Sequence, residues 1–276
     1  MNNTIRNKNY EELEFRDDFM FGITMSDKEL CRDVIECLTG QPVGELQDVQ
    51  SQHEIRITSS GKPIRLDIYT MDDKAVYDAE MQNLNNKSIK SLELPKRTRF
   101  YQSSIDMDHI NKSGSYKELP DSKILFICTF DPFGCDLYKY VFRERCDDDP
   151  KLLLCDGTEK IFYNCCYKGD NISTDLRRFY DYVEKGIVSD ALTERIDAAV
   201  QNARKNEKWR SAYMKERIIF QELKEEARAE GRAEGRAEGR AEGRAEEQAN
   251  TERERKRAEL AEARVKELEA LLAAKQ

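Results

Sequence analysis

The sequence from Lys224 to Gln276 has no aromatic residue and consists mainly of charged residues, alanine and glycine, which limits where a core can form. The motif Arg-Ala-Glu-Gly occurs four times in succession from Arg228 to Gly243. Each glycine disfavours a helix by about 1 kcal/mol relative to alanine, and the four-residue period places like charges at i,i+4. The core therefore has to come from residues 1–223, which are enough for one domain of ordinary size.

The end of this tail has a different pattern. After Thr251 the glycines stop, and Ala261, Val265, Leu268 and Leu272 form a short seam with the a/d spacing of a coiled coil. One interpretation is a helical stalk through which the chain forms a homo-oligomer. The other is a charged, frayed extension produced by replication slippage. The sequence favours neither.

The composition argues against several classes of function. The formal net charge of −8 argues against phosphate binding over the whole surface, although a basic patch or a metal ion can supply local positive charge. The eight cysteines contain no C-x-x-C pair, and with two histidines no zinc site is expected. Serine-hydrolase and Walker motifs are missing. No apolar run has the length of a signal-peptide core or a membrane span, so we expect a cytoplasmic protein without a membrane partner.

Hydrophobic periodicity predicts a domain that mixes helices and strands. Helices are expected from Asp17 to Gly40, from Pro95 to about Asn111 and beyond Ser173, and strands at 53–58, 63–71, 75–82, 123–130, 137–145 and 160–165, with a turn at 59–62. This order indicates an α/β (α+β) domain with a mixed sheet flanked by helices. The expected divisions are a flexible N-terminus (1–15), a main domain (16–190), a helical extension (191–223) and a helical or coiled-coil tail (224–276).

Acidic residues gather on the predicted hairpin of 63–82. Side chains alternate between the two faces of a strand, so Asp67 and Tyr69 are expected on one face and Leu66 and Ile68 on the other. A turn at residues 73–74 pairs Asp67 with Glu80, whereas a turn at 72–73 pairs it with residue 78. In either register Asp67 and Glu80 share a face within roughly 8 Å.

Two carboxylates this close repel each other unless a cation lies between them. Mg²⁺ or Mn²⁺ is commonly bound by one or two carboxylates and several waters, and it can lower the pKa of a bound water. We therefore expect Asp67, Glu80 and the backbone carbonyl of Met81 as metal ligands. Asp67, Glu80 and Gln82 are the expected catalytic residues, with Gln82 orienting the attacking water or a phosphate. The alternative is a solvent-facing strand whose acids only keep it soluble.

A basic helix follows the hairpin. Arg97 and Tyr101 lie at i,i+4 on one face, and Lys96 and Arg99 add positive charge, as do the lysines at 87 and 90. Arg and Tyr side chains can contact phosphate oxygens, so Arg97, Tyr101, Lys96 and Arg99 are the residues expected to contact DNA. The alternative is a solvated helical face with a packed tyrosine.

Motifs in a fixed order along residues 15–220 carry a resemblance to a known family. They are Asp18-Phe19-Met20-Phe21, Arg65-Leu66-Asp67-Ile68-Tyr69, Tyr77-Asp78-Ala79-Glu80-Met81-Gln82, Arg97-x-x-x-Tyr101, Gly114-x-Tyr116-x-x-Leu119 and Phe130-Asp131-x-Phe133. In this succession they resemble the PD-(D/E)xK nuclease family transposases, the recombination-promoting nuclease group. A C-terminus rich in Glu, Gly, Arg and Ala is also frequent in that group.

The resemblance implies a restriction-endonuclease-like sheet, Mg²⁺ or Mn²⁺ held by Asp67 and Glu80, and Asp18 as a third acid. It implies a DNA endonuclease linked to recombination or mobile elements. Gln82 stands where the superfamily has lysine, so a cation that helps to hold the nucleophile is missing. One alternative is therefore a catalytically weak or inactive nuclease-fold protein that binds DNA or acts as a scaffold and oligomerises through its tail. Another is an interaction module in which the tail is the functional part.

Overall fold

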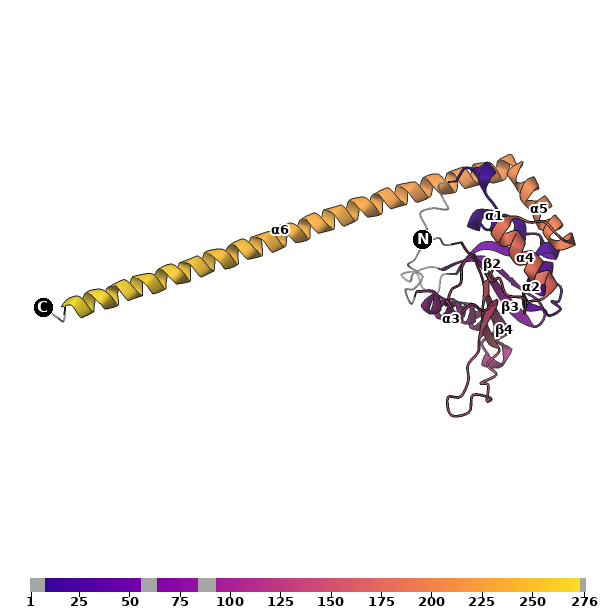
Figure 1. Ribbon diagram of the computed structural model, residues 1–276, viewed down its shortest axis with the longest axis horizontal. Helices are drawn as coiled ribbons and strands as arrows, with labels where there is room; N and C mark the ends of the chain where they lie inside the picture. Colours follow the sequence, from indigo (N-terminus) through magenta and orange to yellow (C-terminus); the bar gives the residue numbers. More distant parts are fainter. Residues whose placement is uncertain (1–7, 56–63, 84–92, 274–276) are drawn as a thin grey trace. The chain divides into compact units, whose positions relative to one another are not determined.

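The computed structural model describes residues 8–55, 64–83 and 93–273, and the chain divides into two units, Met1–Met214 and Lys215–Gln276 (Figure 1). The expected turn at 59–62, the lysines at 87 and 90, and residues 1–7 lie outside the described residues. In chain order the elements are η2 (Tyr10–Glu12), α1 (Asp18–Met25), α2 (Lys28–Thr39), β1 (Gln50–Ile55), β2 (Ile64–Met71), β3 (Ala75–Gln82), α3 (Glu93–Ser113), η4 (Tyr116–Glu118), β4 (Asp121–Cys128), β5 (Lys139–Phe142), β6 (Thr158–Asn164), α4 (Thr174–Lys185), α5 (Ala191–Arg204) and α6 (Glu207–Ala273).

The strands of the first unit form one mixed sheet in the order β1-β2-β3-β4-β6-β5. β1, β2 and β3 form an antiparallel meander, β4 is parallel to β3, β6 is parallel to β4, and β5 is antiparallel to β6 at the edge. A parallel pair needs a long crossover, which α3 provides between β3 and β4. The expected α/β class, with a mixed sheet, helices and a C-terminal helix, is confirmed at this level.

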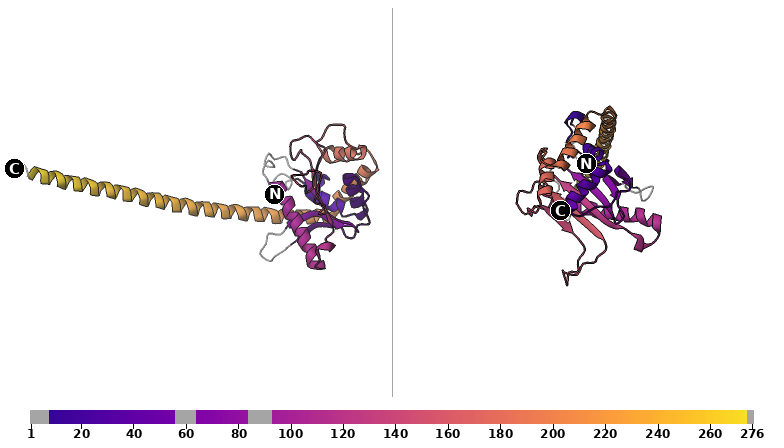
Figure 2. Two further views of the ribbon diagram at one scale, coloured as in Figure 1. Left: turned by 90° about the horizontal axis from the view of Figure 1, so that it is seen from below. Right: turned by 90° about the vertical axis from the view of Figure 1, so that its right-hand side faces the viewer.

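Helices lie over both faces of the sheet (Figure 2), and a hydrophobic cluster packs on each face. The larger cluster joins α1, α2, α4 and α5 to residues such as Ala79 and Leu125. The smaller cluster joins α3, through Tyr101 and Ile105, to residues such as Phe126. Because both faces are covered, β3 is buried along its whole length. Polar side chains of β3 on the α3 side are therefore enclosed between sheet and helix.

Residues 8–15 are packed, so the expectation of a flexible segment through residue 15 is wrong for its described part. Tyr10 and Phe15 are almost inaccessible to solvent. The ring of Phe15 contacts Phe21 on α1 and Phe179 on α4, and the Tyr10 hydroxyl donates a hydrogen bond to the Ala203 carbonyl at 2.6 Å. These residues contact α1, α4, α5 and α6 and have no helical periodicity of their own, which is why periodicity alone did not identify them.

Capping residues set the helix boundaries. The helical run expected from Asp17 to Gly40 consists of two helices, because Asp27 accepts the Leu30 amide at 2.9 Å and starts α2. Gly40 ends α2 with φ +68°, a left-handed conformation that favours glycine.

Further along, α5 falls in the range expected as a helical extension, and it packs into the larger cluster through Ile196 and Val200.

α6 begins at Glu207 and continues through the glycine repeats to Ala273. Every residue from 225 to 270 is exposed. Ion pairs recorded within the described part of the tail join residues three or four apart between 252 and 267. Among the described residues, no helix is both long and apolar enough to cross a membrane.

Candidate carboxylate site

Asp67 and Glu80 meet where the pairing between β2 and β3 ends. The ladder runs from Met71 opposite Val76 to Ile68 opposite Ala79, which is the register expected for a turn at residues 73–74. Beyond the ladder, the Asp67 amide donates to Glu80 Oε1 at 2.8 Å and the Met81 amide donates to Asp67 Oδ2 at 3.1 Å. Each carboxylate is thus fixed by the backbone of the other strand.

The face alternation expected for β2 is wrong at this point. Leu66 packs with Tyr69 in the smaller cluster, whereas Ile68 belongs to the larger one. On β1, Gln52 lies between the residues paired with Leu66 and Ile68 and has φ +57°, a conformation that residues other than glycine seldom adopt. Both strands therefore turn over at this position. Asp67 lies at the turnover, with its carboxylate directed at the β3 backbone, and does not simply share a face with Tyr69.

Asp78 belongs to the same cluster, although it was not among the predicted site residues. It lies two residues before Glu80 and is fully buried. When Asp78 and Glu80 are both ionised, neither oxygen of Asp78 accepts a hydrogen bond. When one proton is present, Asp78 and Glu80 can share it in a hydrogen bond. The alternation of side chains along a strand indicates this placement, because residues 78, 80 and 82 alternate with the core residues 77, 79 and 81.

Arg97 of α3 is bonded to this cluster. Its guanidinium donates to Glu80 Oε2 at 3.0 Å, to Gln82 Oε1 at 3.3 Å and to the Tyr101 hydroxyl at 3.0 Å. It also lies 5.6 Å from the ring centroid of Phe126. Arg97 and Tyr101, which were expected to contact DNA, are therefore engaged beside the carboxylates together with Gln82.

Burial raises the pKa of all three carboxyl groups. The pKa of Asp67 lies well above its ordinary value because of burial and then the charges of Glu80 and Asp18. Burial and the charge of Asp67 raise the pKa of Asp78, and burial and the charge of Asp78 raise the pKa of Glu80. Arg97 lowers the pKa of the last two. Arg65 lowers the pKa of Asp67. Because the pKa of each carboxyl group is raised in spite of Arg97 and Arg65, the cluster favours a bound proton or a bound cation.

The remaining expected residues lie at different distances from this cluster. Asp18, at the start of α1, is close enough for its charge to raise the pKa of Asp67 and Glu80. Lys96 and Arg99 are on the exposed surface of α3. The fold thus brings Asp67, Glu80 and Gln82 together with Asp18 nearby, and leaves the two basic residues on the outer side of the same helix.

The donor set suits Mg²⁺ or Mn²⁺ chemically, since carboxylate and amide oxygens are hard ligands. Over the described ranges, no group of three or more His, Cys, Asp and Glu side chains is already arranged to hold a metal ion. Mg²⁺ often takes only one or two carboxylates and completes its shell with water. Asp67 and Glu80 would be these two carboxylates. The Met81 carbonyl as a ligand stays a prediction; its amide is held by Asp67.

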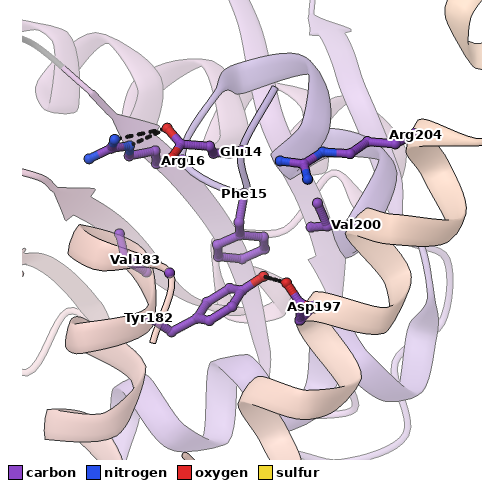
Figure 3. A pocket seen from close by; sticks show the side chains of 9 residues that line it. Glu14, Phe15, Arg16, Tyr182, Val183, Asp197, Val200 and Arg204 are labelled. Carbon is purple, nitrogen blue, oxygen red and sulfur yellow. Dashed lines mark hydrogen bonds and ion pairs between the residues drawn. The ribbon is translucent and has the colours of Figure 1, made fainter. Parts of the chain in front are cut away.

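A separate pocket lies between the N-terminal segment, α4 and α5 (Figure 3). Arg16 donates to the Glu184 carbonyl at 3.0 Å, and Arg204 donates to the Leu13 carbonyl at 2.7 Å. These groups fasten the N-terminal segment to the domain, and Asp67, Asp78 and Glu80 do not line the pocket. The pocket therefore belongs to the packing of residues 8–15 and not to the carboxylate site.

Comparisons with protein-family models, with curated proteins and with solved structures found no match to this chain.

Proposed function

We propose that the chain is a Mg²⁺- or Mn²⁺-dependent DNA endonuclease of the PD-(D/E)xK class, linked to recombination or mobile elements. The observation that supports this most is the gathering of three buried carboxyl groups, Asp67, Asp78 and Glu80, with Arg97 bonded to Glu80. The eight free cysteines suit a reducing, cytoplasmic compartment.

The chain's own residues have distinct roles in this proposal. A divalent cation held by Asp67 and Glu80 would supply positive charge at a phosphate and lower the pKa of a water. Both carboxylates are already oriented by backbone amides, so little rearrangement is needed to hold a cation. The Gln82 carbonyl accepts from Arg97, which leaves its amide group to donate to a phosphate oxygen. Lys96 and Arg99 would contact the DNA backbone.

A second candidate is a nuclease-fold protein that binds DNA or acts as a scaffold with weak or no catalysis. Two observations favour it. Glu80 Oε2 is engaged by Arg97 at 3.0 Å, and Gln82 carries no positive charge where the resembling family has lysine. Because Arg97 competes with a metal for Glu80, this candidate predicts weak metal binding.

Nicking of a supercoiled plasmid in Mg²⁺ or Mn²⁺ tests the first candidate. We expect nicking that EDTA abolishes and that falls at least about 100-fold in Asp67→Asn and Glu80→Gln, because each change removes a charge that holds the cation. These neutral isosteres also relieve repulsion and should keep the protein folded. Asp73→Asn, an exposed acid in the turn of the same hairpin, is the control and should nick like the wild type.

Calorimetric titration with Mn²⁺ separates the two candidates. If the wild type binds Mn²⁺ without nicking DNA, and Asp67→Asn loses this binding, the result supports the inactive nuclease fold. Undiminished nicking in both isosteric variants would show that the catalytic site lies elsewhere.

A further inference from the structure

The exposed charges of α6 fall into separate stripes. Successive residues of a helix are about 100° apart, so a four-residue repeat returns close to the same side and aligns arginine with arginine and glutamate with glutamate. The glycines at 231, 235, 239 and 243 lie between the two stripes, with arginine on one side and glutamate on the other. No Arg–Glu pair inside the repeat is three or four residues apart, which is the spacing that neutralises charges within one helix. Within the repeat these charges therefore have no oppositely charged side chain one turn away, and they are accessible to a partner outside their own helix.

The seam beyond Thr251 has the same arrangement at a different spacing. Val265 and Leu268 are 53% and 47% exposed, although they occupy a and d positions of a heptad with Ala261. In that heptad the g positions are arginine (257 and 264) and the e positions are glutamate (262 and 269). Gly243 precedes Ala261 by about five turns at 3.6 residues per turn, so these two residues lie on the same side of the helix, while the two flanks exchange sides between the repeat and the seam. We call these two stretches, the glycine stripe of 231–243 and the seam of 257–269, the flanked face.

We propose that the flanked face pairs in parallel with the same face of a second copy of the chain. When a two-fold axis runs along the helices, the arginine flank of each copy meets the glutamate flank of the other. In the seam, Arg257 then meets the partner's Glu262 and Arg264 meets the partner's Glu269. An antiparallel pair instead brings arginine to arginine on one flank and glutamate to glutamate on the other. Charge complementarity therefore selects both the occupant and its direction.

The glycines make this pairing geometrically accessible. A Cβ atom built at any of the repeat glycines meets nothing within 4 Å, so the backbone is open on this face and a second helix can approach until the flanking side chains meet. The period of four exceeds 3.6, so the stripe drifts in the sense that gives a right-handed crossing. This inference concerns the second unit alone and holds whether or not the carboxylate site is a nuclease.

A cysteine on the flanked face tests the direction of pairing. The full chain, with exposed Cys135 and Cys155 replaced by serine, receives either Ala261→Cys on the seam or Ala263→Cys on the opposite side of the helix. Under mild oxidation we expect a covalent dimer from Ala261→Cys and several-fold less from Ala263→Cys, because a parallel pair places two copies of position 261 face to face. Equal cross-linking of both variants, no cross-linking of either, or a monomeric mass by light scattering at micromolar concentration overturns the proposal.

Charge reversal tests the flanks by sedimentation equilibrium. Changing the four arginines at 228, 232, 236 and 240 to glutamate should raise the dimer dissociation constant roughly ten-fold or more. Changing the glutamates at 230, 234, 238 and 242 to arginine should do the same, although it shifts the net charge the opposite way. The combined swap restores complementarity and should recover wild-type affinity. The pairing is refuted if the combined swap does not recover the wild-type affinity. It is also refuted if the chain is a monomer that uses the arginine stripe only to bind DNA.

Discussion

Two ion pairs of almost the same length lie in very different regions of the molecule. Glu80 and Arg97 are 3.0 Å apart, with the Glu80 side chain only 2% exposed. On α6, Arg255 and Glu259 are 2.9 Å apart, but both are more than half exposed. An exposed i,i+4 pair contributes about 0.3–0.5 kcal/mol, whereas breaking a buried pair leaves a desolvated charge. Burial, and not the distance between the charged atoms, decides how much the loss of an ion pair costs in stability. The first unit concentrates unbalanced charge, and the tail spreads nearly balanced charge over its surface.

The largest contrast is expected for apolar residues. Phe15 is 3% exposed and contacts several aromatic rings, whereas Leu260 on α6 is 71% exposed. Phe15→Ala should lower the free energy of unfolding of the first unit by about 3–5 kcal/mol, and Leu260→Ala should leave it within about 0.5 kcal/mol of the wild type. Urea denaturation followed by tyrosine fluorescence measures both. A loss below about 1 kcal/mol for Phe15→Ala would mean that residues 8–15 are not part of the core.

The ion pairs give the next contrast. Arg97→Ala should destabilise the protein by about 2 kcal/mol, less than the ~3–5 kcal/mol of a fully buried pair, because Arg97 is partly exposed and Glu80 can take up a proton. Arg255→Ala should cost at most about 0.5 kcal/mol. The same denaturation curves, without divalent ions, provide the comparison. Arg99→Ala, on the exposed side of α3, is the matched control and should resemble Arg255→Ala.

The buried carboxyl groups also predict a pH dependence that the exposed tail does not share. Their folded-state pKa values lie above their ordinary values. The protonated cluster therefore stabilises the fold below the ordinary carboxyl range of about pH 4, and this contribution is lost as pH rises through the raised pKa values. In EDTA the cluster's contribution to the free energy of unfolding should decrease over that interval.

Asp78→Asn should flatten this dependence and stabilise the metal-free protein near neutral pH by about 1–2 kcal/mol, because it removes a buried charge without a donor. Denaturation midpoints measured across the pH range, with Asp73→Asn as control, provide the readout. Mn²⁺ should stabilise the wild type at neutral pH by binding only the folded state. Identical profiles for Asp78→Asn and the wild type would contradict the raised pKa of Asp78.

Sequence patterns predicted the element order well, because it depends on local signals, but they left two hairpin registers open. The structure has the register with the turn at Asp73–Lys74, which brings Asp67 near Glu80. Two features depended on tertiary context instead. Gln52 turns over the β1 and β2 strands through a positive φ, which no hydrophobic pattern records. The role of Arg97 depends on α3 packing over β3, so the sequence indicated its charge but not that it bonds to Glu80.

The smallest expected effects come from glycine, and they should differ in sign between the two regions. Gly40 ends α2 with φ +68°, so Gly40→Ala should destabilise the first unit by about 1 kcal/mol through strain at a positive φ. Gly235 lies inside α6 with open space around a Cβ atom, so Gly235→Ala should favour the helix locally by about 1 kcal/mol. Urea denaturation should detect only the first change. Hydrogen exchange of α6 amides at low concentration should detect only the second, as slower exchange around residue 235. Slower exchange extending into the first unit would show that the two regions unfold together.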